Sequence, residues 1–310
     1  MNGKGNSMNQ NVHIIGAATA FGQPRLGVDF GPDALRYAGL IKMLKELGLS
    51  VTDKGNIRGN FEVEAGRHNI KNDDNLLNYD AVKDFNTILA GAVDASVSNG
   101  HFPLILGGDH SLSIGSLAGI SRHYNDLGVI WYDAHGDLND SRTSPSGNIH
   151  GMPLGISCGL GDTDLVNLYD SGPKIKPENI VLVGVRDLDE GEKQFIQEND
   201  IQTFTMTDIR RMGIADVMQQ ALDHLEEKCD GIHLSLDVDG LDPMETPGTG
   251  TPVNGGLSLS ETQLAMSILN DSDRITSMDL VEVNPLLDDG NKTAGKAVEI
   301  AASLFGKKQL

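Results

Sequence analysis

Residues 103–111 read PLILGGDHS, and this stretch decides how the rest of the chain is interpreted. It begins with a short apolar run, 103–106, which is typical of a strand buried on both faces of a sheet. Similar runs rich in Val, Ile and Leu lie at residues 12–15, 129–132, 180–183, 232–236 and 275–281. Strands of this kind belong to parallel sheets, because helices cover both faces of such sheets. The sequence therefore predicts a parallel sheet at the centre of the molecule.

Helical patterns alternate with these runs, at residues 33–47, 81–97, 216–228, 261–270 and 293–305. Pro32 suits the first turn of the first helix, and Ser258 with Glu261 has the spacing of a capping box. Strand–helix alternation indicates an α/β fold with helices on both faces of the sheet. Residues 55–78 are polar and irregular, which favours a surface excursion over a domain boundary. We expect one domain over residues 11–310, preceded by a flexible tail at residues 1–10.

The composition narrows the class of partner. A formal net charge of -20 argues against binding to nucleic acid or to an anionic membrane, and is compatible with a cationic small substrate. Cys158 and Cys229 are far apart and form no C-x-x-C motif, so a reducing cytoplasm is expected. The polar start of the chain lacks the apolar stretch of a signal peptide, and no run is long enough to span a membrane.

Three of the predicted strands end in side chains that can bind metal ions. His110 follows the first of them, Asp133, His135 and Asp137 follow the second within DAHGD, and Asp237 and Asp239 follow the third within SLDVDGLDP. Ligands of open parallel sheets collect at the carboxyl ends of the strands. Alternate residues of extended backbone also point the same way, so these side chains can converge.

The number and charge of these side chains indicate two metal ions. Six ligands are too many for one ion, and the four carboxylates carry a charge that two divalent cations would balance. Without cations the carboxylates would repel one another. Oxygen ligands with some imidazole and no thiolate favour manganese over magnesium, and zinc or cobalt could bind as well.

Two further residues can serve catalysis at the same sheet edge. His150 lies among glycines in SGNIHGMP (146–153), where it could protonate a leaving group, although such a histidine can also be a turn residue. Glu282 follows the last strand in VEVNP (281–285), where the alternative is a solvated edge charge. No P-loop lysine follows Gly107 and Gly108, and no G-x-S-x-G elbow occurs.

Taken together, GGDHS (107–111), DAHGD, SLDVDGLDP and VEVNP make the chain resemble the ureohydrolase family, in its arginase branch, over nearly the whole length. The resemblance implies a three-layer α/β/α domain on an eight-stranded parallel sheet with two manganese ions. The first ion would be held by His110, Asp133, Asp137 and Asp237. The second would be held by Asp133, His135, Asp237 and Asp239. The catalytic residues would be His150, Glu282 and Asp137.

The resemblance also implies a substrate, L-arginine, and its hydrolysis to L-ornithine and urea by a hydroxide that bridges the two ions. Asn139, Ser146 and Asn148 match the positions that hold the α-carboxylate, and Asp189 and Glu192 match those serving the α-amino group. Thr251 is similar to the family's pocket threonine, and Glu282 would pair with the guanidinium. Members of this branch form homo-oligomers, so a hexamer or trimer is expected.

Three alternatives stay open on the sequence. An agmatinase or guanidinobutyrase would share the metal loops but act on guanidines without an α-carboxylate. A binuclear metallophosphoesterase also mixes Asp, His and Gly-Asn-His patterns, although residues 147–150 carry an extra residue between Asn and His. A non-catalytic metal-bound sensor or scaffold would be expected to have lost a ligand or His150, and none is lost.

Overall fold

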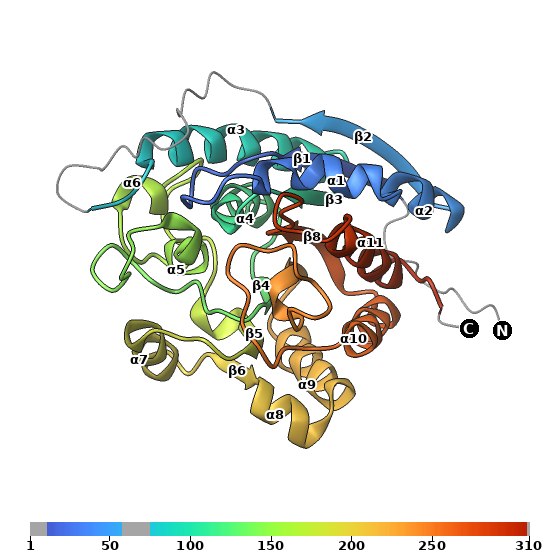
Figure 1. Cartoon of the computed structure of the whole chain (residues 1–310). Coiled ribbons are helices and arrows are strands. Elements are labelled where there is room, and N and C mark those ends of the chain that lie inside the picture. The colour runs from blue at the N-terminus through green and yellow to red at the C-terminus, as the bar shows by residue number, and fades with distance from the viewer. Residues whose placement is uncertain (1–10, 58–74, 309–310) are drawn as a thin grey trace.

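The computed structural model describes residues 11–57 and 75–308, and these form one sheet with helices on both faces. All eight strands are parallel, in the order β2-β1-β3-β8-β7-β4-β5-β6. In Figure 1 the labelled strands follow each other from β2 at the top to β6 in the lower part of the view. The strands are β1 (Asn11–Ala17), β2 (Ser50–Asn56), β3 (Phe102–Gly107), β4 (Leu127–Tyr132), β5 (Ile180–Val185), β6 (Gln202–Thr205), β7 (Gly231–Asp237) and β8 (Ile275–Val281).

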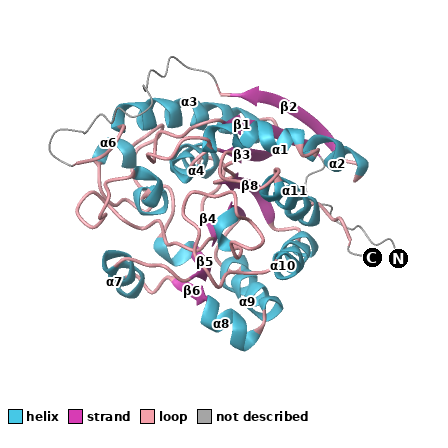
Figure 2. Cartoon of the chain, in the orientation of Figure 1, coloured by secondary structure: helices cyan, strands magenta, loops and turns pink. Residues whose placement is uncertain are grey.

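Two helical layers enclose the sheet, as the three-layer prediction required (Figure 2). One layer contains α1 (Gly31–Tyr37), α2 (Leu40–Glu46), α8 (Met206–Met212), α9 (Ile214–Glu226), α10 (Leu259–Ser272) and α11 (Lys292–Leu304). The other contains α3 (Tyr79–Ser98), α4 (Ser113–Ser121), α5 (Pro153–Ser157), α6 (Thr163–Val166) and α7 (Glu190–Glu198).

The central strands supply apolar side chains to both layers. Every residue of β3, β4 and β7 is buried, which confirms the interpretation of their continuous apolar runs. Alternate residues point to opposite faces: Leu104 and Ile130 pack in the core beneath α9–α11, whereas Ile105 and Trp131 pack beneath α3 and α4. Each fully buried Leu or Ile side chain contributes about 1.5–3 kcal/mol to folding. The sheet is therefore held rigidly from both sides.

Most of the predicted elements are confirmed, and two details were wrong. The helix expected over residues 33–47 is divided into α1 and α2 by Gly39, whose positive φ of 97° ends one helix before the next begins. The irregular excursion expected from residue 55 begins later, because Gly55 and Asn56 belong to β2, and residues 58–74 lie outside the described residues. The predicted tail at residues 1–10 also lies outside them. The capping box of Ser258 and Glu261 is confirmed at α10.

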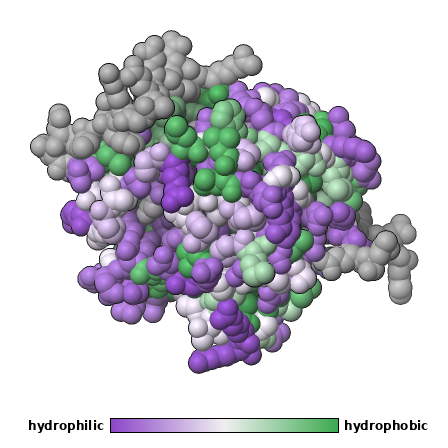
Figure 3. All heavy atoms as spheres, in the orientation of Figure 1, coloured by the Kyte–Doolittle hydropathy of each residue, from purple (hydrophilic) through white to green (hydrophobic). Residues whose placement is uncertain are grey.

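The middle of the sheet positions the loops that carry the candidate site. The strands β3, β8, β7 and β4 are consecutive neighbours, and each ends in one of the motifs identified above. On the face seen in Figure 3, hydrophilic residues predominate and apolar residues form small separate patches. None of the helices in the described ranges is long and apolar enough to cross a membrane.

Candidate metal centre and active site

The side chains predicted as metal ligands meet at the carboxyl ends of β3, β4 and β7. They form two groups in which the ligand atoms lie within 4.8 Å of one another. The first group is His110, Asp133 and Asp237, and the second is Asp133, His135 and Asp239. Asp133 belongs to both groups, so its two carboxylate oxygens can face two different ions.

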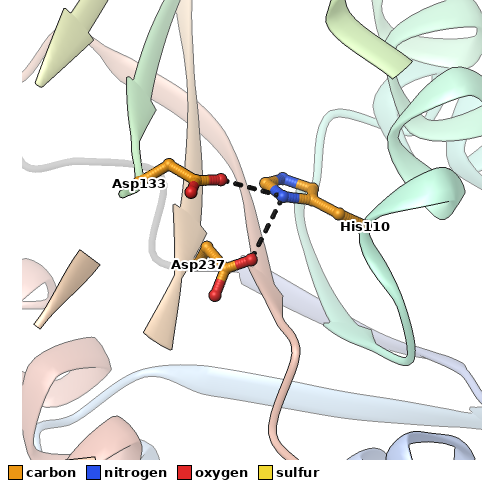
Figure 4. Close-up of side chains that lie close together, drawn as sticks. All are labelled: His110, Asp133 and Asp237. Carbon is orange, nitrogen blue, oxygen red and sulfur yellow. Dashed lines mark ion pairs between the residues drawn. The ribbon is translucent and has the colours of Figure 1, made fainter. Parts of the chain in front are cut away.

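In the first group, Nδ1 of His110 is surrounded by carboxylate oxygens (Figure 4). It lies 3.1 Å from Oδ2 of Asp133, 3.0 Å from Oδ2 of Asp137 and 3.3 Å from Oδ2 of Asp237. Asp137, which the three-residue group does not include, therefore also reaches this position. Its backbone is left-handed, with φ of 51°, which turns the carboxylate back toward the strand ends.

The ring of His110 is fixed by contacts that local sequence patterns do not indicate. Its Nε2 lies 2.8 Å from the hydroxyl of Ser235 on β7, and its ring stacks on Trp131 of β4 with centroids 4.2 Å apart. A hydrogen bond at one imidazole nitrogen leaves the other directed at the metal position. Ser235 and Trp131 therefore orient His110 from beneath.

In the second group, His135 and Asp239 approach Asp133 from the other side. Nδ1 of His135 lies 3.4 Å from Oδ1 of Asp133 and 3.2 Å from Oδ2 of Asp239. The hydroxyl of Thr251 donates to the same oxygen of Asp239 at 2.9 Å. Asp187, which was not predicted as a site residue, lies with Oδ2 3.9 Å from Nε2 of His135.

The electrostatics of the two groups fit divalent cations. Nδ1 of His110 and Oδ2 of Asp133 are buried and have no partner with hydrogen-bond geometry. Burial, together with the charges of Asp239 and Asp133, raises the pKa of Asp237 well above its usual range. Burial and the charge of Asp133 raise the pKa of Asp239 to about 6. Buried oxygen and imidazole ligands that repel one another and lack partners are what a pair of divalent ions would stabilise.

The metal groups open into a polar cavity of about 160 Å³. It is lined by four of the predicted ligands, His110, His135, Asp137 and Asp237, and by most of the predicted substrate residues: Asn139, Ser146, Asn148, Asp189, Glu192 and Thr251. His150 lines it too, and Ser144, Pro145, Gly151 and Asp187 are lining residues that were not predicted. Asp133, Asp239 and Glu282 are almost completely buried and lie behind this lining.

Asp189 and Glu192 form the outer acidic side of the cavity at the start of α7. The carboxylate of Glu192 accepts hydrogen bonds from the backbone N–H of Leu138 at 3.1 Å and of Asp189 at 2.8 Å. Burial raises the pKa of Glu192 to about 7. Asn139 donates its amide to Oδ2 of Asp189 at 2.9 Å. The end of the β4 loop and the start of α7 are thereby joined at the cavity wall.

Glu282 lies between His110, His150 and Gln23. Nε2 of Gln23 donates to both of its carboxylate oxygens, at 3.0 and 2.7 Å, and the backbone N–H of His110 donates at 2.9 Å. Nδ1 of His150 lies 3.4 Å from Oε1. Burial acts to lower the pKa of His150, but the hydrogen bond and charge of Glu282 raise it above its usual value. The backbone of Glu282 is left-handed, with φ of 64°.

Comparisons with known proteins agree with this arrangement. A model described as "Arginase family" matches residues 10–306. A curated arginase of Staphylococcus aureus (strain COL) is 54% identical, and the alignment covers 96% of this chain and 98% of that protein. The arginase of Bacillus subtilis (strain 168) is 53% identical over 98% of this chain and 100% of its own length. The crystal structure of the arginase from Bacillus caldovelox has a TM-score of 0.92 at 52% identity, covering 97% of this chain and 99% of that one. On the family match and these relatives, this chain belongs to the arginase family.

Proposed function

We propose that this protein hydrolyses L-arginine to L-ornithine and urea. The observation that carries the proposal is the pair of ligand groups sharing Asp133, directly behind a cavity lined by Asn139, Asn148 and Asp189. The relatives described above are named as arginases, which supports the same substrate. Water is the second reactant, so the atoms of arginine and one water molecule make up the two products.

Two manganese ions are the proposed cofactors. His110, Asp133, Asp137 and Asp237 would hold the first, and Asp133, His135, Asp237 and Asp239 would hold the second. Oxygen and imidazole ligands suit manganese. When bound, such ions lower the pKa of a shared water molecule, so that hydroxide is available near neutral pH. Asp133 and Asp237 would be the bridging ligands.

Glu282 is proposed to bind the guanidinium group and to orient its carbon toward the metal centre. Its carboxylate is kept in place by Gln23 and by the backbone N–H of His110. These bonds leave further lone pairs on the carboxylate oxygens, which can accept hydrogen bonds from a guanidinium. Because the carboxylate is buried and held at a fixed place, it contributes to the rate by positioning the substrate.

His150 is proposed to donate a proton to the nitrogen that leaves as the side-chain amine of ornithine. It lines the cavity and lies 3.4 Å from Glu282, whose charge raises the pKa of the imidazole. The raised pKa increases the fraction of His150 that carries a proton near neutral pH. Protonation makes the amine a better leaving group, which is the task of a general acid.

The outer residues of the cavity are proposed to recognise the amino-acid end of arginine. Asn139, Ser146 and Asn148 would donate hydrogen bonds to the α-carboxylate, and Asp189 and Glu192 would serve the α-ammonium group. Thr251 would support the site by holding Asp239, to which it donates a hydrogen bond. This recognition would separate L-arginine from agmatine, which lacks the carboxylate.

Measuring urea release from L-arginine and from agmatine tests the proposal, with the metal content of the same sample determined in parallel. We expect a strong preference for L-arginine, loss of activity after chelation and recovery on adding manganese. Preference for agmatine would place the protein with the agmatinases, and hydrolysis of a phosphate ester would favour a metallophosphoesterase. Activity that does not respond to metal removal would refute the two-ion centre.

We also propose that the protein acts in the cytoplasm as a homo-oligomer, a hexamer or a trimer. The basis is the resemblance described above together with the sparse cysteines of the chain. Sedimentation equilibrium of the purified protein tests the assembly, and a monomeric mass would contradict it.

A further inference from the structure

Arg186 makes an unusual set of contacts just behind the second ligand group. It follows β5 directly and is partly buried. Its five N–H groups make six hydrogen-bond contacts, at least one N–H being shared, with the backbone carbonyl oxygens of Gly184, Asp239, Gly240, Leu241 and Val253. The shortest is from Nη2 to the carbonyl of Asp239, at 2.6 Å. None of these acceptors is a carboxylate, so the contacts are not those of an ordinary ion pair.

These hydrogen bonds join three separate segments of the chain. One is the end of β5, the second is the turn after β7 that carries Asp239, and the third is the loop that carries Thr251 and Val253. Nη2 by itself contacts the carbonyls of Asp239, Leu241 and Val253, at 2.6, 3.1 and 2.9 Å. The side chain of Thr251 closes the arrangement by donating to Oδ2 of Asp239. Both the backbone and the carboxylate of Asp239 are therefore held by groups tied to Arg186.

Only arginine can satisfy this set of carbonyl groups. Its planar guanidinium offers five N–H donors in a fixed fork, whereas lysine offers its donors from a single nitrogen. Without Arg186 these carbonyl oxygens would lose the donors that its side chain supplies, and each oxygen left unsatisfied would lower the stability of the fold. Gly256 packs tightly against this region, since a Cβ there would lie 2.6 Å from Nη2 of Arg186 and 2.5 Å from the carbonyl carbon of Leu241.

We propose that Arg186 is the positioning residue of the second metal position, that of Asp133, His135 and Asp239. It fixes Asp239 and the Thr251 loop where the carboxylate can meet an ion, and its positive charge faces Asp239 and Asp133. The ligands that belong to the first position alone, His110 and Asp137, have no hydrogen bond with Arg186, and the shared ligands Asp133 and Asp237 interact with its charge but accept no hydrogen bond from it. Loss of Arg186 therefore weakens the second ion and leaves the first ion's own ligands in place. This inference rests on the proposed two-ion centre.

The test is to titrate metal-free protein with manganese and to count the bound ions per chain, comparing wild type with Arg186→Lys and Arg186→Met. Removing a residue that orients a metal ligand typically lowers metal affinity about 10- to 100-fold. We expect the first ion to bind as in wild type and the apparent Kd of the second to rise at least about tenfold. The electron paramagnetic resonance signal of coupled ions should then give way to that of isolated manganese at low metal concentration.

Arg210→Met is the matched control. Arg210 is exposed and donates one hydrogen bond to the same loop, from Nη2 to the carbonyl of Gly255 at 2.8 Å. This variant should bind both ions as wild type does. The melting temperature of each metal-free protein is measured as well, because a purely structural role would lower it without separating the two ions.

Two results would overturn the proposal. One is an Arg186→Lys chain that folds and binds both ions with wild-type affinity, and the other is loss of both ions in parallel. If Arg186→Met does not fold, Arg186→Lys still tests the proposal, because lysine keeps the positive charge but not the planar fork of donors. A wild-type chain that binds a single ion would instead refute the two-ion centre. This outcome is therefore distinguishable from one that refutes only the role of Arg186.

Discussion

Replacing Gln23 by Met tests whether the carboxylate of Glu282 must be held for catalysis. Met has a similar length but cannot donate, so both contacts of Nε2 with Glu282, at 3.0 and 2.7 Å, are lost. Hydrogen bonds to charged groups contribute about 1.5–3 kcal/mol, and about 1.36 kcal/mol corresponds to a tenfold change in rate. We therefore expect kcat/KM for L-arginine to fall about 10- to 150-fold.

Steady-state urea release measures the effect, and a double-mutant cycle with Glu282→Gln assigns it. If Gln23 acts through Glu282, the Gln23→Met change should have little further effect in the Glu282→Gln background. Metal content should be unchanged in all three variants, because the side-chain contacts of Gln23 and Glu282 are with each other, with the backbone of His110 and with His150, and not with a proposed ligand side chain. An unaltered kcat/KM in Gln23→Met, or equal losses in both backgrounds, would refute the reasoning.

Three other predictions concern single side chains. Asp133→Ala should lose metal and activity together, because both ligand groups include Asp133; metal analysis showing full occupancy would contradict its bridging role. His150→Asn should lower kcat without changing metal content, and an unchanged kcat would rule out the proton donor. Asp279→Asn should destabilise the fold at pH 7 by about 1–3 kcal/mol, as measured by urea unfolding, because the hydrogen bonds from Ser113 and Ser116 then end on a neutral amide and lose the contribution of the charge. Burial acts to raise the pKa of Asp279, but His233 and the two hydroxyls hold it below 3.8. The stabilisation is thus complete above that pH and is lost as pH falls further, so a difference between variant and wild type that grew in acid would contradict the assignment.

The strands of the sheet centre could be predicted from the sequence, and its edges could not. β3, β4 and β7 are buried throughout, and their continuous apolar sequences indicate this burial. β2 (SVTDKGN) and β6 (QTFT) lie at the two edges and are largely polar, so no apolar pattern marks them. The number of strands was therefore expected from the resemblance and not from the apolar runs.

The helix α4 illustrates a second limit of local patterns. Its sequence, SIGSLAGIS, is rich in residues that disfavour helices, and nearly all of it is buried. A Cβ at Gly115 would lie 2.6 Å from the carbonyl oxygen of Asn86, and one at Gly119 would lie 2.5 Å from that of Ala90. These glycines allow α4 to pack closely on α3. Tertiary packing thus determines the helix, and local propensity does not indicate it.

The same distinction applies to the site. The convergence of the candidate ligands could be predicted because each motif follows its own strand, and parallel strands end at one edge. Gln23 and Glu282 are separated by 259 positions, and nothing near Gln23 in the sequence indicates their contact. Ser235 and Arg186 act through His110 and Asp239 in a similar way, across neighbouring strands. Contacts of this kind depend on the folded sheet, so they become visible only in the structure.

The left-handed backbone of Glu282 lowers the stability of the fold at a residue that the proposed reaction requires. A non-glycine residue in this conformation costs about 1–2 kcal/mol. Glycine at position 282 would relieve the strain but remove the carboxylate. A laboratory selection for heat resistance alone would weigh this strain only against the three hydrogen bonds of the carboxylate and would place no value on its role in catalysis. Glu282 should therefore be kept unchanged in any mutant library built to raise the melting temperature of this protein.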